Sequence, residues 1–358
     1  MSWLLSDAWL AVVTRRLLTV SIHVLGAVVL GVAAPILLLV TGAIDVLQAL
    51  RRRPVAVRWE WSRVFLFLLA YLFAETAGLV VAGWLWLRHG AWRGFGGANG
   101  ARRWARYLDG NYLLQEKWIS ALGGSGLRLY GIRLRLEGED AVPGGPILFF
   151  IRHASIADSV LAGILLQSGH GFRLRYVLKR RLLLDPCFDI VGNRLPNRFA
   201  RRGSDRPEEE VAAVAKLAEG LGRDEGVLIY PEGTRFTPEK RERLLATLEE
   251  RGAVVELERA RRLCHVLPPR LGGPLALLET NARSATPANA LFCAHAGFEG
   301  GTTLGELLRG QIIGRTVYIR FWRVPFAEIP HALDERVAWL YGEWEKVEEF
   351  VKEHACSP

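Results

Sequence analysis

The chain of 358 residues is poor in sulfur, with four cysteines and one methionine. Cys187, Cys264, Cys293 and Cys356 are scattered, and no two of them form a C-x-x-C pair. This spacing argues against a zinc site or a disulfide framework. We therefore expect the thiols to be small buried side chains in a reducing compartment.

Lysine is absent from the first 106 residues, which hold 12 Arg and only four acidic residues, a net charge of +8. The remaining residues hold 34 basic and 33 acidic side chains, a net of +1. Nearly all of the +9 therefore belongs to the most apolar third of the chain. This combination favours an anionic membrane surface as partner and argues against nucleic acid.

Two apolar runs account for the hydrophobicity of this third. Residues 17–44 carry no formal charge, and residues 64–87 are interrupted only by Glu75. Each is long enough to span a bilayer core, which takes roughly 20 helical residues. We predict that 1–106 is a membrane anchor with helices at about 17–44 and 64–87 plus a basic interfacial segment. A cleaved signal peptide is the alternative for the first run, although a second run follows.

The Arg residues of the anchor lie both between the two runs and outside them, so the positive-inside rule cannot hold on both sides of a two-pass span. A re-entrant or monotopic hairpin resolves this conflict, and Pro35 would permit a bend. Whether the hairpin spans the membrane stays open. Glu75 should be protonated, paired or near the surface.

The rest of the chain alternates strand-like and helix-like segments. The rhythm predicts an α/β fold, in which a mainly parallel sheet is flanked by helices and preceded by the two-helix hairpin. We assign 107–330 to this domain and 331–358 to a C-terminal helix. Residues 92–122 read as an interfacial or core helix. Expected strands cover 127–136, 146–152, 174–178, 226–230, 290–294 and 316–322, and expected helices cover 157–166, 207–221 and 333–351.

A buried strand ends in Arg152-His153, and Asp158 follows five residues after the histidine. With His153 in the turn and Asp158 in the first turn of a helix, the carboxylate can orient the imidazole, which can then take a proton from a hydroxyl. Open α/β sheets place their sites at such strand ends. An Asp that caps the helix beside an ordinary loop histidine is the structural alternative.

Two further segments support a site. The strand 226–230 runs into Pro231-Glu232-Gly233-Thr234-Arg235, in which the Gly permits a tight turn and the Thr-Arg pair suits a phosphate. A loop with five Arg at 192–206 precedes a helix and could bind an anionic headgroup.

Together these segments resemble the glycerolipid acyltransferase family, in particular the 1-acylglycerol-3-phosphate (lysophosphatidic acid) acyltransferases. His153 and Asp158 match its HxxxxD block, and Tyr230 to Phe236 matches its PEGTR block. The stretch His265 to Gly273 is similar to a fourth block with a Leu-Pro-Arg segment. The resemblance covers about residues 140–275, although many members have Asn where this chain has Arg152.

The resemblance implies that His153 is the general base and Asp158 its orienting partner. It places Glu232, Gly233, Thr234 and Arg235 in the acceptor site, with Arg235 on the phosphate. In the second block, Arg202 and Arg198 both fit as phosphate ligands by different alignments, with Arg202 slightly ahead. Pro268 belongs to the fourth block, which in the family shapes the acyl site.

We expect an O-acyltransferase that moves a fatty acyl group from acyl-CoA or acyl carrier protein to the sn-2 hydroxyl of lysophosphatidic acid in phospholipid biosynthesis. Glycerol 3-phosphate or another lysolipid is the alternative acceptor. The partners are then membrane lipids, the lysophospholipid and the acyl donor, and neither a cofactor nor a metal is expected. The active site would face the cytoplasm.

Two other classes of protein fit less well. A serine hydrolase would need a GxSxG elbow, which Gly123-Gly124-Ser125-Gly126 does not provide. A catalytically silent membrane-anchored binding protein would not need His153, Asp158, Glu232 and Arg235 together.

Overall fold

The computed structural model describes residues 3–51, 57–91, 97–155, 157–201, 206–299, 305–306, 309 and 311–355. The chain forms two compact units. The helical unit comprises Met1–Gly131, Leu178–Arg202 and Leu308–Ile313, and the sheet unit comprises Ile132–Val177, Gly203–Leu307 and Gly314–Pro358.

These divisions differ from the expected ones in two ways. The boundary expected at 106 falls inside α3 (Gly97–Tyr130), which continues without a break to Tyr130. The C-terminal helix α11 (Leu333–Ala355) packs on the strand β6 (Asn289–Ala296) and is part of the sheet unit. Burial of its apolar stripe is what binds it there, since Leu340, Trp344 and Val347 are fully buried.

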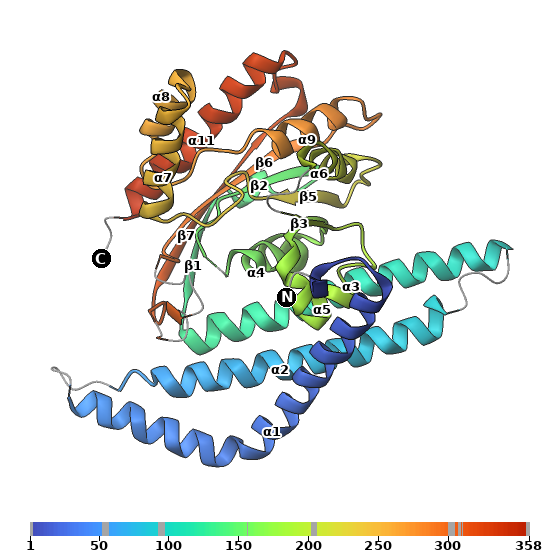
Figure 1. Ribbon diagram of the computed structural model, residues 1–358, viewed down its shortest axis with the longest axis vertical. Helices are drawn as coiled ribbons and strands as arrows, with labels where there is room; N and C mark the ends of the chain where they lie inside the picture. Colours follow the sequence, from blue (N-terminus) through green and yellow to red (C-terminus); the bar gives the residue numbers. More distant parts are fainter. Residues whose placement is uncertain are drawn as a thin grey trace. The chain divides into compact units, whose positions relative to one another are not determined.

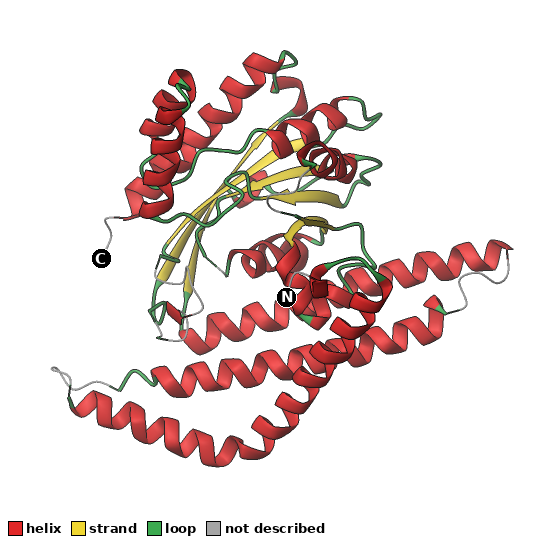
Figure 2. Cartoon of the chain, viewed as in Figure 1, coloured by secondary structure: helices red, strands yellow, loops and turns green. Residues whose placement is uncertain are grey.

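Three long helices dominate the helical unit (Figures 1 and 2). Helix α1 (Trp9–Leu50) packs on α2 (Glu60–Leu85), and α2 packs on α3. Both apolar helices are longer than the runs that predicted them, and α1 continues through Pro35 with a bend in the ribbon (Figure 1). A π-helical turn, Trp86–Gly90, extends α2. Short elements complete the unit: η1 (Trp3–Leu5), η5 (Arg180–Leu184), α5 (Pro186–Ile190) and the strand β4 (Arg198–Ala200).

The segments 9–50 and 60–90 are long and apolar enough to cross a membrane by length and composition. Along α1 large apolar side chains stay exposed, among them Val32 and Leu39 at 79% and 76%. Such a surface suits lipid better than water, and it is consistent with membrane association.

Buried charges in the helical unit have partners. Glu75, fully buried, accepts hydrogen bonds from Trp118 Nε1 at 2.8 Å and from the backbone N–H of Cys187 at 3.2 Å. The expectation that Glu75 is paired is thus confirmed. The buried Arg15 guanidinium makes a two-point contact with Asp189, at 3.0 and 2.8 Å, which ties α1 to α5 within this unit.

The sheet has the strand order β1-β7-β6-β2-β5-β3-β4. The pairings β1–β7, β2–β6, β2–β5 and β3–β5 are parallel, and β6 pairs with β7 in antiparallel fashion. The predicted fold, a mainly parallel sheet flanked by helices, is confirmed. The remaining bounds are β1 (Arg133–Glu137), β2 (Ile147–Ile151), β3 (Arg173–Lys179), β5 (Glu225–Ile229) and β7 (Thr316–Val324).

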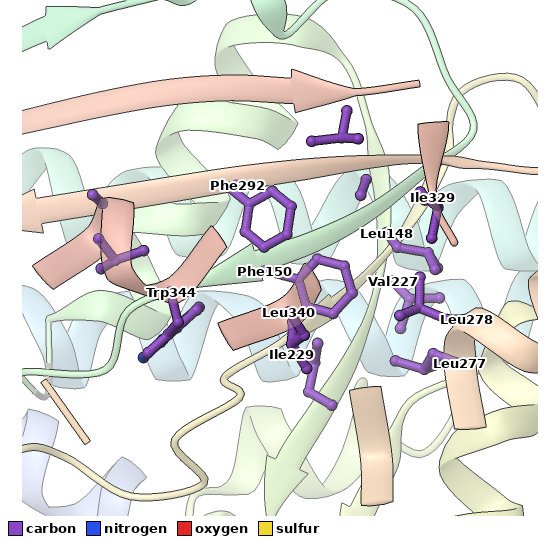
Figure 3. Packing of buried hydrophobic residues seen from close by; sticks show 14 of the residues in the cluster. Leu148, Phe150, Val227, Ile229, Leu277, Leu278, Phe292, Ile329, Leu340 and Trp344 are labelled. Atoms are coloured by element: carbon purple, nitrogen blue, oxygen red, sulfur yellow. The ribbon is translucent and has the colours of Figure 1, made fainter. Parts of the chain in front are cut away.

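Strand β2 lies in the middle of this order and is buried on both faces, as its uninterrupted sequence Ile-Leu-Phe-Phe-Ile requires. One face packs against α6 (Pro207–Ala215), α9 (Gly272–Ala282) and α11. Figure 3 shows Phe150 and Phe292 of neighbouring strands stacked there, close to Leu340 and Trp344. Each such side chain contributes about 1.5 to 3 kcal/mol by leaving water, which fixes the strand ends that carry the polar residues.

Two local expectations were wrong, one for a strand and one for a cysteine. Residues 127–130 are the last turn of α3, so that the strand expected at 127–136 begins only at Arg133. The charged stretch after the PEGTR block forms two helices, α7 (Pro238–Glu250) and α8 (Val254–Arg262). Cys187 and Cys293 are buried as expected, but Cys264 is exposed, and Cys356 lies outside the described residues.

Candidate active site

The candidate site is built at the carboxyl ends of β2 and β5, which are adjacent parallel strands. The two following turns are joined by main-chain contacts. The backbone N–H of His153 donates to Glu232 Oε1 at 2.9 Å, and the N–H of Phe236 donates to the carbonyl of His153 at 2.9 Å. The structure therefore brings the first and third sequence blocks together, at the edge where open α/β sheets place ligands.

His153 lies in the turn after β2, and Asp158 is the first residue of α4 (Asp158–Ala162). Asp158 Oδ2 accepts the N–H groups of Ala154 and Ser155 at 2.7 and 2.8 Å and contacts His153 Nδ1 at 3.0 Å. A carboxylate only accepts, so Nδ1 carries the hydrogen and Nε2 is the unprotonated nitrogen. The imidazole is thus held in the tautomer that a general base needs.

Asp158 is fully buried. Burial alone would raise its pKa, but nearby His295, the hydrogen bond from His153 and the backbone N–H of Ser155 hold the pKa below the ordinary value. The ring of Tyr230 lies 4.4 Å from that of His153, centroid to centroid. The pair is therefore fixed on one side by hydrogen bonds and on another by an aromatic contact.

Glu232 is also buried, but its carboxyl group serves the protein backbone. Oε1 accepts from His153, and Oε2 accepts the N–H of Leu267 at 3.1 Å. Burial raises its pKa to about 8 despite Arg152 and the two N–H donors. In this structure Glu232 is a bridge between the first, third and fourth blocks.

Gly233 makes the turn with φ of +63°, where a side chain would be strained. A Cβ at this position would also come within 2.8 Å of the Arg270 side chain. Thr234 and Arg235 follow, both partly buried. The Arg235 carbonyl accepts a 2.7 Å hydrogen bond from Lys240 Nζ, so the residues after the turn are anchored to the start of α7.

The fourth block is held by the C-terminal helix, which the sequence did not indicate. Glu348 Oε2 accepts the N–H groups of His265 and Val266 at 2.7 and 3.1 Å, and Trp344 Nε1 donates to the Leu267 carbonyl at 2.9 Å. Pro268 is buried directly after these anchors. No sequence motif marks α11, and the sequence predicted only a helix with an apolar stripe there.

Arg152 and His295 are two further residues that sequence reasoning passed over or left without a role. The buried Arg152 guanidinium donates to the carbonyls of His295 and His265 at 2.6 and 3.1 Å and pairs with Glu299 at 2.9 Å. His295, at the end of β6, lies 3.5 Å from Asp158 Oδ1. Arg152, where many family members have Asn, thus links the end of β2 to the end of β6 and to the fourth block, directly before His153.

Residues up to Arg202 of the second block belong to the helical unit, whereas the site described above belongs to the sheet unit. Arg198 begins β4 in the helical unit, and Arg202 lies outside the described residues. Neighbouring arginines bind protein groups within the helical unit: Arg201 pairs with Asp7 at 2.9 Å, and Arg194 donates to the Ala82 carbonyl at 2.8 Å. Neither prediction for a second-block phosphate ligand is tested by this arrangement.

Within the described ranges, no three His, Cys, Asp or Glu side chains gather as a metal site. What the residues present can do is accept a proton at His153 Nε2 while Asp158 balances the resulting charge. That is acid–base chemistry on a hydroxyl or similar group.

Residues 133–267 match the family model described as Acyltransferase. This stretch, which holds the HxxxxD and PEGTR blocks, is therefore similar to acyltransferase domains, and the similarity supports the predicted class of enzyme. A solved structure, that of the 1-acyl-sn-glycerophosphate (LPA) acyltransferase PlsC from Thermotoga maritima, is similar over 78% of this chain and 98% of that chain. The identity is 12% and the TM-score 0.40, values too low to carry any inference about substrate.

Proposed function

We propose that the enzyme transfers a fatty acyl group from acyl-CoA or acyl carrier protein to the sn-2 hydroxyl of lysophosphatidic acid. The observation that carries the proposal is the 3.0 Å contact of His153 Nδ1 with Asp158, which leaves Nε2 as the basic nitrogen. An acyl thioester is already activated, so deprotonation of the acceptor hydroxyl is the main task left to side chains.

In the proposed step, His153 Nε2 takes the hydroxyl proton as the oxygen attacks the thioester carbonyl carbon. The tetrahedral intermediate then expels the thiolate, and the C–S bond breaks as the ester forms. The imidazolium returns its proton to the thiolate, which leaves as a thiol. Asp158 stabilises the imidazolium between the two proton transfers, and no acyl-enzyme is needed.

The acceptor headgroup is the finer part of the proposal. Arg235 follows a turn that is hydrogen-bonded to the His153 backbone, and an Arg there suits a phosphate monoester. Glycerol 3-phosphate has the same monoester and stays the alternative acceptor. Arg198 and Arg202 stay proposed as second-block ligands.

The proposal is tested with purified enzyme, labelled acyl-CoA or acyl carrier protein, and three acceptors: lysophosphatidic acid, glycerol 3-phosphate and a zwitterionic lysolipid. We expect lysophosphatidic acid to react fastest and His153→Ala to lower kcat by about 10² to 10⁴. His170→Ala, an exposed histidine, is the matched control and should keep full activity. Retained activity of His153→Ala would refute the proposed base.

Arg235→Gln should raise KM for the two phosphate monoesters and leave KM for the zwitterionic lysolipid unchanged. Arg243→Gln, on α7, is its control. Equal effects on all three acceptors would refute the phosphate contact.

We also propose that the apolar helices bind the membrane and that the active site faces the cytoplasm, where acyl-CoA and acyl carrier protein are available. Cys264 is exposed, whereas Cys187 and Cys293 are buried. In a Cys356→Ser background, a membrane-impermeant maleimide should therefore label Cys264 in inside-out vesicles and not in sealed cells. The opposite labelling would refute this orientation.

A further inference from the structure

Asp158 uses its two carboxylate oxygens unequally. Oδ2 accepts hydrogen bonds from His153 Nδ1 and from two backbone N–H groups. Within the described residues Oδ1 has no hydrogen-bond partner, and His295 Nε2 lies 3.5 Å from it. Both side chains are completely buried, so this contact is screened little by water.

The tautomer of His295 follows from its other neighbour. Nε2 lies 3.1 Å from the carbonyl oxygen of Arg152, and a carbonyl only accepts. Nε2 therefore carries the hydrogen and donates it to Arg152 O, and Asp158 Oδ1 lies 3.5 Å from the same nitrogen. Nδ1 has no hydrogen-bond partner among the described residues, which agrees with a neutral ring.

His295 and Arg152 also bind each other reciprocally. The His295 ring donates to the Arg152 carbonyl, and Arg152 Nη1 donates to the His295 carbonyl at 2.6 Å. The N–H of Arg152 further donates to the Cys293 carbonyl at 3.2 Å. These contacts join the carboxyl ends of β6 and β2 at the residue directly before His153.

We propose that His295 is a positioning residue of the acyl-transfer site: its Nε2–H, fixed by the Arg152 carbonyl, supports the Asp158 carboxylate from the side opposite to His153. The inference rests on the proposed role of His153 as base. As His153 becomes charged, Asp158 must stay an anion in a fixed place. The positive end of a neutral N–H dipole 3.5 Å from Oδ1 favours the anion without adding a competing proton.

Burial lowers the pKa of His295, which favours the neutral ring beside Asp158. The charged and titratable groups around the pair come from three strand ends. They are Arg152 and His153 after β2, Tyr230 and Glu232 after β5, and Cys293, His295 and Glu299 in or after β6.

The experiment compares His295→Leu, which removes the donor at similar volume, with His295→Gln, whose amide N–H can take the place of Nε2–H. Acyl transfer by the full-length enzyme is followed as kcat/KM against pH. His295→Leu should lose about tenfold in kcat, because the buried carboxylate loses the dipole that faces Oδ1 where water screens little. His295→Gln should regain most of it, and His170→Leu is the matched control.

The pH profile separates positioning from a structural role. Without the donor, the Asp158–His153 pair holds a proton more tightly, so the acidic limb of kcat/KM should move to higher pH by about 0.5 unit. A general loss of structure would lower activity at all pH values without moving the limb. An unmoved limb in His295→Leu, or equal impairment of His295→Gln, would overturn the inference.

If His295→Leu does not fold, His295→Asn serves instead, because its amide reaches only the place of Nδ1 and should show the same shift of the limb. Its limb staying unmoved would likewise overturn the inference. If His153→Ala is inactive and the acidic limb of the His295 variant does not move, the role of His295 is refuted and the proposed base stands. An active His153→Ala refutes the proposed base and the role of His295 with it.

Discussion

Two buried carboxyl groups stand at neighbouring strand ends of the same sheet and behave in opposite ways. Asp158, after β2, has its pKa held low by His295, His153 and a backbone N–H, whereas burial raises the pKa of Glu232, after β5, to about 8. Equal burial thus does not mean equal charge. The difference indicates that Asp158 works as an anion beside the reacting histidine, while Glu232 holds three backbone segments together.

Asp158→Asn should give the largest effect. The side-chain carbonyl can still accept the N–H groups of Ala154 and Ser155, but the negative charge that balances the His153 imidazolium is lost. We expect kcat to fall by about 10² to 10⁴ with little change in thermal midpoint. The measurement is acyl transfer beside a melting curve. Near-normal kcat would remove the distinction between the two carboxyl groups.

Glu232→Gln should act mainly on stability. An amide nitrogen cannot accept, so one of the two buried N–H groups, of His153 or of Leu267, loses its acceptor. We expect the free energy of unfolding to drop by about 1 to 3 kcal/mol, measured by denaturant titration. Glu242→Gln on the exposed face of α7 is the control. A higher acceptor KM at unchanged stability would instead make Glu232 a substrate ligand.

The pH dependence of stability should give the smallest effect. Because the folded state holds the Glu232 proton up to about pH 8, it binds more protons than the unfolded state above about pH 4.5. Stability from this group is therefore lost as pH rises through that window. Asp158, with its pKa lowered, contributes stability that is lost only on acidification below about pH 4.

The Glu232 effect is isolated by subtracting the unfolding free energy of Glu232→Gln from that of the wild type at each pH. The difference should fall by about 1 kcal/mol between pH 5 and 8, since some water penetration weakens a buried shift. A difference that rises with pH would mean that Glu232 is an anion in the folded protein, like Asp158.

Local patterns predicted the parts of the site that lie within one strand and its following turn. The run Ile147 to Ile151 just before His153 and the spacing to Asp158 predicted the pair, with support from the Pro231 to Arg235 segment. His295 could not be predicted because β6 reaches β2 only through sheet pairing 143 residues away in sequence. Arg152 was noticed as a departure from the family pattern, but its acceptors lie on two distant segments.

Helix α11 shows the same limit in the fold. Its apolar stripe was predicted correctly, yet Glu348 looked like any exposed charge on an amphipathic helix. The burial of Glu348 and its two hydrogen bonds from backbone N–H groups depend on where the helix docks. A helical spacing of apolar residues does not predict that docking position. Likewise, Leu127 to Tyr130 alternates like a strand, but continuation of α3 decided its conformation.

The anchoring of the fourth block by Glu348 and Trp344 has a practical consequence for fragments of this enzyme. The family match ends at residue 267, whereas the acceptors and donors for residues 265–267 lie more than 70 residues further along the chain. A fragment cut at the limit of the match would retain the HxxxxD and PEGTR blocks but leave three backbone polar groups of residues 265–267 without their partners. A fragment meant to fold should therefore extend through α11, so that these hydrogen bonds are kept.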